Sequence, residues 1–212
     1  MEISSRKNIV VTGGGGDIAK AMFSILPKEK YNVFLPSRKE LDVCDDLSVE
    51  SYFNELHVDV LINNAGYIVP RELKDRDLGS ELKTIDVNLS GVYRATISAL
   101  KNNNDSLKII NIGSSAGTKA RGAWGAYCAT KAALIMLTKC WADEGVDVVC
   151  LSPGRTATKM RTSLFGLEET SELMKVEDFA RVVYLAIEGK FEVGENIDVN
   201  LSNVRSVCEG IS

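Results

Sequence analysis

The sequence predicts an α/β fold, in which a doubly wound parallel sheet of about seven strands carries helices on both faces. Short apolar runs rich in Val, Ile and Leu alternate along the chain with longer segments in which apolar residues recur every three or four positions, as in a helix. The first of these strands, the β-branched run at residues 9–12, leads straight into four glycines and then into a helical pattern. With 212 residues, of which 45% are apolar and 25% charged, the chain suits one globular domain, so we expect a single domain over residues 1–212.

The composition argues against several classes of function. A net charge of −4 argues against a protein that binds nucleic acid or an anionic membrane, because such a protein needs a positively charged surface. The apolar runs are far shorter than a membrane span, and the short polar stretch before residue 8 has no secretory pattern, so we expect a cytoplasmic protein. Five scattered cysteines without a C-x-x-C pair fit a reducing compartment, and the single histidine, His57, gives no basis for a metal site.

The glycine turn after the first strand is the context that a dinucleotide-binding loop needs. Its glycines let the backbone approach a pyrophosphate, and the first amides of the following helix supply donors that the helix dipole strengthens. Four successive glycines can also form a plain flexible turn. The candidate contacts in this loop are Gly13, Gly16, Asp17 and Ile18.

Two further strands are expected at residues 32–35 and 40–43, and they predict where the adenosine end of a dinucleotide binds. Ser37 and Arg38 follow the glycines by about twenty residues, where such folds contact the adenosine ribose. The end of the third strand supplies two candidates for contact with the adenine ring, Asp42 and Val43.

The middle of the chain continues the alternation, with a helix at residues 48–56 and a fourth strand at 58–62. Small residues after that strand suit a backbone passing close to a flat ligand, although the bare tetrapeptide would be an ordinary turn. These candidates are Asn64, Ala65 and Gly66. A long helix at residues 82–100 contains Asn88, and a fifth strand at 107–112 places Ser114 at the carboxyl edge of the sheet, where ligands bind in open α/β folds.

The last third of the chain completes the pattern. An apolar helix headed by Tyr127 closes near residue 144, and a sixth strand at 146–151 leads into a Pro-Gly segment. A final amphipathic helix, Val176–Ile187, and a seventh strand, Asn196–Val199, follow.

Tyr127 and Lys131 lie four residues apart, so their side chains can point from one helical face into the same cleft. A tyrosine has an unperturbed pKa of about 10 and is a poor acid or base near neutrality. A cation about 4 Å away, at an effective dielectric near 20, favours the phenolate by roughly 4 kcal/mol, or about three pKa units. The pair therefore predicts a catalytic phenol, although a Tyr with a Lys at this spacing is also a common accident on helix surfaces.

Taken together and in order, T-G-G-G-G-D-I, N-N-A-G, the Asn88 helix, Ser114 thirteen residues before Tyr127, Lys131 and P-G-x-x-x-T resemble the short-chain dehydrogenase/reductase family. The resemblance covers nearly the whole chain and implies a Rossmann-type fold. It also implies that this single domain binds a dinucleotide and is catalytic.

The resemblance implies a role for each matching residue. Ser114 and Tyr127 would hydrogen-bond a substrate carbonyl, and Tyr127 would donate its proton as the nicotinamide delivers hydride. Lys131 would hold the nicotinamide ribose and keep the phenolate accessible, while Asn88 would anchor a water that links Lys131 to solvent. The nicotinamide end of the cofactor would be met by Pro153, Gly154, Thr156 and Thr158.

The cofactor preference follows from the residues after the second strand. An enzyme that prefers NAD usually carries an Asp or Glu there, which binds the ribose 2′-hydroxyl. This chain has Ser37 and Arg38, and a guanidinium can bind phosphate oxygens in a bidentate way. We therefore expect NADP(H) to be preferred and NAD(H) to be possible. Arg38 can instead stack on adenine or pair with Glu40 and have no effect on the choice.

The leading hypothesis is an NAD(P)(H)-dependent oxidoreductase that reduces a carbonyl or oxidises the alcohol. One alternative, from the G-x-x-G-x-x-A spacing, is a reductase or epimerase of a nucleotide-linked sugar; another is a non-catalytic protein that senses the dinucleotide. The pocket candidates are mostly apolar and suggest a hydrophobic or flat carbonyl substrate, or else simply pack a lid. These candidates are Ser115, Ala116, Trp124, Met160, Leu164 and Phe165.

The family usually assembles through the helices beside the active site, so the resemblance implies a homodimer or homotetramer. The apolar residues Leu134, Leu137 and Trp141 extend the surface of the Tyr127 helix and are the candidates for that interface. Alternatively, they simply pack on the sheet.

Overall fold

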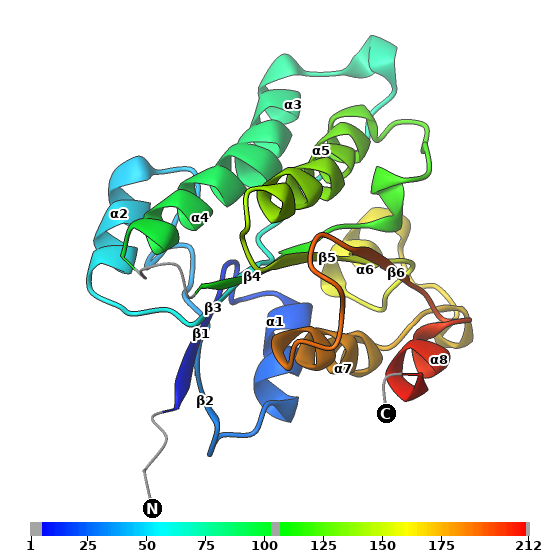
Figure 1. Cartoon of the computed structure of the whole chain (residues 1–212). Coiled ribbons are helices and arrows are strands. Elements are labelled where there is room, and N and C mark those ends of the chain that lie inside the picture. Colours follow the sequence, from blue (N-terminus) through cyan, green and yellow to red (C-terminus); the bar gives the residue numbers. More distant parts are fainter. Residues whose placement is uncertain (1–5, 103–106, 211–212) are drawn as a thin grey trace, which may run out of the picture.

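The computed structural model describes residues 6–102 and 107–210, which form a parallel sheet with helices on both of its faces (Figure 1). The sheet order is β2-β1-β3-β4-β5-β6, and every neighbouring pair runs parallel. The strands are β1 (Lys7–Val11), β2 (Tyr31–Phe34), β3 (Val60–Asn63), β4 (Lys108–Ile112), β5 (Val148–Pro153) and β6 (Asn196–Val199). The predicted doubly wound α/β fold is confirmed.

Successive side chains of each buried strand point to opposite faces of the sheet, and this divides the core into two layers. Ile9 and Val11 pack into the cluster under α1 (Asp17–Ile25) and α7 (Val176–Ile187), whereas Val10 packs into the cluster on the opposite face. That opposite face is covered by α2 (Asp46–Asn54), α4 (Gly91–Lys101) and α5 (Gly125–Asp143), as Figure 1 shows. Helices on both faces leave the ends of the strands as the place where polar side chains can gather.

The predicted third strand at residues 40–43 is wrong, and the described residues contain six strands rather than about seven. The backbone N–H groups of Glu40 and Leu41 both donate to the carbonyl of Ser37, and the N–H of Asp42 donates to the Ser48 hydroxyl. These backbone N–H groups are therefore bonded within turns and to a side chain, and they are not available to pair with a neighbouring strand. Leu41 is still buried, which is why the segment has the hydrophobicity of a strand.

The long central helix begins earlier than expected and is interrupted. Asp77 caps α3 (Leu78–Ile85) by accepting the N–H groups of Gly79 and Ser80. The chain then passes through a π-helical turn, Asp86–Ser90, into α4. The other short elements are α6 (Lys159–Phe165), α8 (Val204–Glu209) and the 3-10 turns Leu73–Asp75, Ser115–Gly117 and Thr170–Glu172. None of the helices in the described ranges has the length and apolar character to cross a membrane.

The interface candidates on the Tyr127 helix are buried within the chain itself. Leu134, Leu137 and Trp141 belong to the core cluster that α5 forms with α4 and the sheet, and each is at most 9% exposed. Their apolar character therefore serves packing on the sheet, which was the alternative interpretation, and any contact between subunits has to use other side chains.

Candidate functional site

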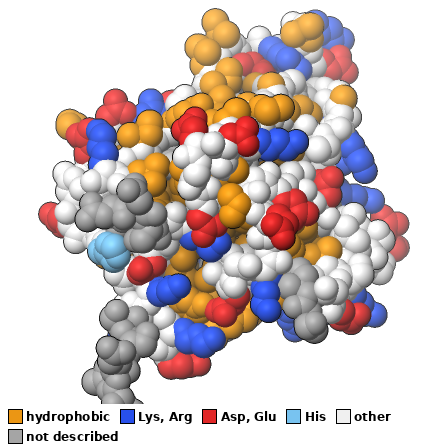
Figure 2. Space-filling view, in the orientation of Figure 1, with side chains coloured by type: hydrophobic (Ala, Val, Ile, Leu, Met, Phe, Trp, Pro, Cys, Tyr) orange, Lys and Arg blue, Asp and Glu red, His pale blue; other side chains and the backbone are white. Residues whose placement is uncertain are grey.

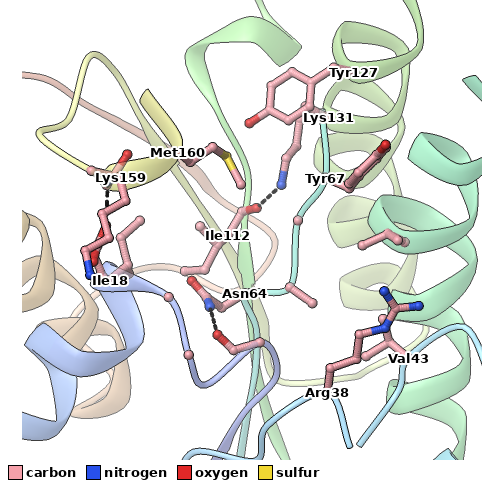
Figure 3. A pocket seen from close by; sticks show the side chains of 18 of the residues that line it. Ile18, Arg38, Val43, Asn64, Tyr67, Ile112, Tyr127, Lys131, Lys159 and Met160 are labelled. Carbon is pink, nitrogen blue, oxygen red and sulfur yellow. Dashed lines mark hydrogen bonds between the residues drawn. The ribbon is translucent and has the colours of Figure 1, made fainter. Parts of the chain in front are cut away.

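A cleft of about 480 Å³ opens at the carboxyl ends of the strands, where the strand order reverses between β2 and β3 on either side of β1. Ligands bind at this switch point in open α/β sheets. Most of the predicted cofactor contacts line it together (Figure 3). They are Gly13, Gly16, Asp17, Ile18, Arg38, Asp42, Val43, Asn64, Ala65, Gly66, Tyr127, Lys131, Pro153 and Thr158.

Two glycines of the first loop are required by close backbone contacts. Gly13 has φ +67°, and a Cβ there would lie 2.9 Å from the Cα of Ala65. A Cβ on Gly14 would lie 2.3 Å from the carbonyl carbon of Leu35. Such contacts exclude any side chain at both positions. The glycine run is therefore a packed loop and not a flexible turn.

Thr12, which sequence reasoning missed, joins this loop to the one after β3. Its hydroxyl accepts the N–H groups of Asn64 and Ala65, each at 3.0 Å, and its carbonyl accepts a bond from the Asn64 side chain at 2.9 Å. Two loops about fifty residues apart in sequence are thus held as one wall of the cleft. A threonine between a buried strand and a glycine turn is the signal that could have identified it.

The residues after β2 form a small charged turn. The Nε of Arg38 donates to Asp42 at 2.9 Å, so the partner of this arginine is Asp42 and not Glu40. Glu40 instead accepts the backbone N–H of Ser37 at 2.7 Å. The Arg38 side chain is 70% exposed and lines the cleft beside Val43 (Figure 3), whereas Ser37 does not line it.

Tyr127 and Lys131 emerge from the first turns of α5, as their spacing predicted. Lys131 is buried and its Nζ donates to the carbonyl of Ile112 at 2.7 Å, while it lies 5.7 Å from the centroid of the Tyr127 ring. The Ser114 hydroxyl lies close enough to the phenol to oppose the rise of its pKa. The three side chains therefore converge at the end of β4.

The protonation preferences of this pair differ from those that the spacing predicted. Burial raises the pKa of Tyr127, and the hydrogen bond from Ser114 opposes this only in part. Burial lowers the pKa of Lys131 to about 8. The predicted lowering of the Tyr127 pKa by Lys131 is absent because the ammonium is directed at the Ile112 carbonyl and the phenolate is desolvated.

Asn88 lies in the π-helical turn and is buried. Its side chain exchanges two hydrogen bonds with the backbone of Tyr67, at 2.8 and 2.9 Å, and donates to the Thr130 hydroxyl on α5 at 3.3 Å. Single π-helical turns are frequent at functional sites. Here the turn aims an amide at the backbone beside the cleft, although Asn88 itself does not line it.

A second, smaller pocket adjoins the cleft and shares Tyr127 with it. Ser114, Gly154 and Thr156 line this pocket and not the larger cleft. All of the predicted pocket residues except the buried Ala116 also line it, and of these Met160 lines the larger cleft as well. The Thr158 hydroxyl caps α6 by accepting the N–H of Arg161. Asp17 accepts the N–H of Lys159 at 2.6 Å, which ties α6 to the glycine loop (Figure 3).

Further residues that no motif predicted also line these spaces. Lys83 of α3 lies 4.8 Å from the centroid of the Tyr67 ring, and both side chains line the larger cleft. Tyr67 directly follows N-N-A-G and could have been included on that ground. In the residues that the structure describes, no three His, Cys, Asp or Glu side chains are grouped to hold a metal ion.

Comparisons with known proteins agree with this architecture. Residues 39–169 match the family model described as short chain dehydrogenase. The chain is 31% identical over 210 residues to the bifunctional ribulose 5-phosphate reductase/CDP-ribitol pyrophosphorylase of Haemophilus influenzae, an alignment that covers 92% of this chain but only 43% of that protein. It is 27% identical to the benzil reductase ((S)-benzoin forming) of Bacillus cereus, over 92% of each chain.

A solved structure leads to the same conclusion. The structure described as ElxO with NADP bound has a TM-score of 0.80 and 25% identity, covering 95% of this chain and 99% of that one. Fold, motif order and family match agree, and the chain belongs to the short-chain dehydrogenase family of oxidoreductases.

Proposed function

We propose that the protein is an NADP(H)-dependent carbonyl reductase, or the reverse alcohol dehydrogenase, with Ser114, Tyr127, Lys131 and Asn88 as its catalytic group. One observation carries the proposal: Tyr127 lines both the larger cleft and the adjoining pocket, with Lys131 on the side of the first and Ser114 on the side of the second. A proton donor shared by two pockets can serve a cofactor in one and a substrate in the other.

The cleft fits a nicotinamide dinucleotide. Gly13, Gly15 and Gly16 line the cleft, and a Cβ at Gly15 would meet no protein atom within 4 Å, so the backbone there is open to close approach of a pyrophosphate at the start of α1. Arg38, Asp42 and Val43 would hold the adenosine end, and Lys131 the nicotinamide ribose. When bound, the cofactor supplies or accepts the hydride.

Side chains of the protein would bind the carbonyl and supply the proton. Ser114 and Tyr127 would hydrogen-bond the carbonyl oxygen, and Tyr127 would transfer its phenolic proton to that oxygen. Burial keeps the phenol protonated beforehand, so its proton is available for transfer, and the Nζ of Lys131 lies 5.7 Å from the centroid of the phenol ring. Asn88 would link the backbone of Tyr67 to Thr130, the residue before Lys131. The water relay through Asn88 that the resemblance implies stays a prediction.

The names of the two relatives support this reading over the alternatives. Both the ribulose 5-phosphate reductase and the benzil reductase are named for reducing a carbonyl. A non-catalytic sensing protein would need neither Tyr127 nor Lys131. The test is a screen of ketones and aldehydes, including benzil and ribulose 5-phosphate, followed by loss of NADPH absorbance. If no carbonyl compound is turned over while NADPH binds, the sensing alternative replaces the proposal.

Cofactor choice depends on Arg38. Its Nε is bound to Asp42 and its side chain is 70% exposed, and we propose that its terminal nitrogens bind the ribose 2′-phosphate. Charge-assisted hydrogen bonds contribute about 1.5 to 3 kcal/mol each, so we expect roughly ten- to a hundredfold tighter binding of NADPH than of NADH. Ser37→Asp combined with Arg38→Ala should reverse this order.

Dissociation constants for the two cofactors, measured by fluorescence titration, check the prediction. Lys39→Ala serves as the matched control, because Lys39 is an exposed neighbour that does not line the cleft. A wild-type chain that binds NADH as tightly as NADPH would show that Arg38 does not recognise the phosphate.

We also propose that the protein forms a homodimer or homotetramer through the outer faces of α4 and α5. Tyr93 and Ile97 on α4, and Met136 on α5, are 41%, 48% and 59% exposed. Figure 2 shows hydrophobic side chains gathered in the upper part of the view, where Figure 1 places α3, α4 and α5. A charge placed on this surface would be buried unpaired in an interface.

Light scattering at micromolar concentration should therefore give at least a dimer mass for the wild type and a monomer mass for Ile97→Glu. Phe23→Glu is the control, since Phe23 is 44% exposed but lies on α1, across the sheet. A wild-type monomer, or an Ile97→Glu variant that keeps the full mass, would contradict the assignment of this surface.

A further inference from the structure

An aromatic row leads outward from Tyr127 and ends at an arginine. The Trp124 ring packs edge-on against Tyr127 with 5.7 Å between ring centroids, and the Arg121 guanidinium carbon lies 5.6 Å from the centroid of Trp124. Phe165 packs on the same indole at 5.7 Å. All four side chains line the pocket that contains Ser114. The exposed Arg121 cation is thus separated from the phenol by the Trp124 indole.

Arg121 differs from the other two arginines of this pocket. Arg155 forms ion pairs with Glu168 at 2.9 Å and with Glu172 at 3.3 Å, and Arg161 is held by both oxygens of Glu168. No carboxylate in the described part of the chain forms an ion pair with Arg121, whose contact is with the Trp124 ring. The protein therefore neutralises two of its pocket cations and leaves the third available.

The backbone around Arg121 is held in an unusual conformation. Ala123 has φ +66°, and it is the one non-glycine residue with positive φ in residues 6–102 and 107–210. Its carbonyl accepts the N–H of Arg71 at 2.9 Å, and the carbonyl of Arg121 accepts the N–H of Trp124 at 3.2 Å. A strained residue persists where surrounding contacts impose it, and such sites cluster at functional positions. The turn fixes Arg121 and Trp124 relative to each other.

A further cavity continues from the same place. Arg121, Arg155, Ser115 and Gly154 line both spaces, and Lys119 lines the outer one. The carboxylates of this outer cavity are Glu172, which pairs with Arg155, and Asp198 on β6. The region beyond the aromatic row is therefore polar, with cations at its junction with the substrate pocket, and it has room for a charged end of a ligand.

We propose that the substrate is an anionic carbonyl compound, whose carboxylate or phosphate binds Arg121 while its carbonyl lies at Tyr127 and Ser114. This rests on the carbonyl reductase function proposed above. A guanidinium binds either anion through two parallel hydrogen bonds, and the cation–π contact of Arg121 with the Trp124 indole holds it beside the pocket. The rings of Trp124 and Phe165 cover the part of the ligand between its two ends.

The test uses two pairs of probes that differ in the charge at one end. One pair is 4-formylbenzoate and its methyl ester, and the other is ribulose 5-phosphate and ribulose. We expect kcat/KM with NADPH to be about ten- to a hundredfold higher for the charged member of at least one pair, mainly through KM. The pair with the larger ratio distinguishes carboxylate from phosphate.

Arg121→Gln should bring that ratio close to one, and Arg121→Lys should keep part of it. Arg181→Gln is the matched control, because Arg181 is an exposed cation on α7 that pairs with Asp178; it should leave the ratio at the wild-type value. A ratio near one in the wild type, or equal losses for both members in Arg121→Gln, would overturn the proposal.

Calorimetry keeps the test decisive for a probe that is bound but not reduced. Each member of a pair is titrated into wild-type and Arg121→Gln protein loaded with NADP⁺, and the charged member should bind about tenfold tighter to the wild type alone. Absence of this difference counts against Arg121. Reduction of a neutral probe that depends on Tyr127 would show that the proposed function stands even where the charge preference fails.

Discussion

Tyr127→Phe should lower kcat for carbonyl reduction at least about a hundredfold while leaving the NADPH dissociation constant unchanged, because it removes one proton donor and nothing else. The phenylalanine ring keeps the edge-on contact with Trp124, so the wall between the two pockets should persist. Ser114 would remain to hold the carbonyl oxygen, yet a serine hydroxyl is a much weaker acid than a phenol and cannot replace it as the proton donor.

Single-turnover measurements with saturating NADPH separate the chemical step from cofactor release. Tyr184→Phe is a suitable control, since this half-buried tyrosine lies on α7 at the opposite face of the sheet. It loses the same hydroxyl without touching either pocket. Near-normal turnover in Tyr127→Phe would remove the phenol from the mechanism and leave Ser114 as the remaining hydroxyl at the carbonyl.

Lys131→Met should impair both turnover and cofactor binding, because the ammonium lies near the phenol and lines the cleft proposed for the cofactor. In the wild type, the lysine is charged below its pKa of about 8 and loses that charge as pH rises through this value. The rate of reduction should therefore fall as pH increases beyond about 8. The Lys131→Met variant should show a low rate that does not fall further above about pH 8. An unchanged dissociation constant for NADPH in this variant would contradict a role of Lys131 in both turnover and cofactor binding.

The lowered pKa of Lys131 also predicts how the stability of the protein depends on pH. Burial lowers the Lys131 pKa from 10.5 to about 8, so between these values the unfolded chain binds a proton that the folded chain does not. The free energy of unfolding contributed by this site therefore rises with pH across that window. The difference in stability between wild type and Lys131→Met, from urea unfolding, should change by about 3 kcal/mol over this range. A pH-independent difference would show that Lys131 titrates normally.

Much of this protein could be predicted from its sequence, because the informative signals are local. Short apolar strands and a glycine turn specify a parallel sheet with a ligand cleft at its carboxyl edge. The spacing of Tyr127 and Lys131 predicts a shared helical face, and the end of a strand positions Ser114 beside them. Each signal depends on backbone geometry within a few residues, and such geometry is readable without knowing what packs against it.

Other features depended on contacts between distant segments. Residues 40–43 alternate charged and apolar side chains as a half-buried strand does, but Asp42 uses its backbone N–H for Ser48 and its carboxylate for Arg38, so no ladder forms. Similarly, the apolar positions along α5 resembled an interface and proved to be core, because α4 and the sheet cover them. Hydrophobicity alone does not say which surface buries a side chain.

The electrostatics of the site depended on tertiary structure most of all. The sequence placed a cation near the phenol of Tyr127, but the carbonyl of Ile112 determines where Lys131 points, and burial determines the direction of both pKa shifts. In the same way, nothing in the sequence distinguishes Arg121 from Arg155. Only the folded chain brings Glu168 and Glu172 to one arginine and an indole ring to the other, because charge neutralisation depends on distances between residues that are remote in sequence.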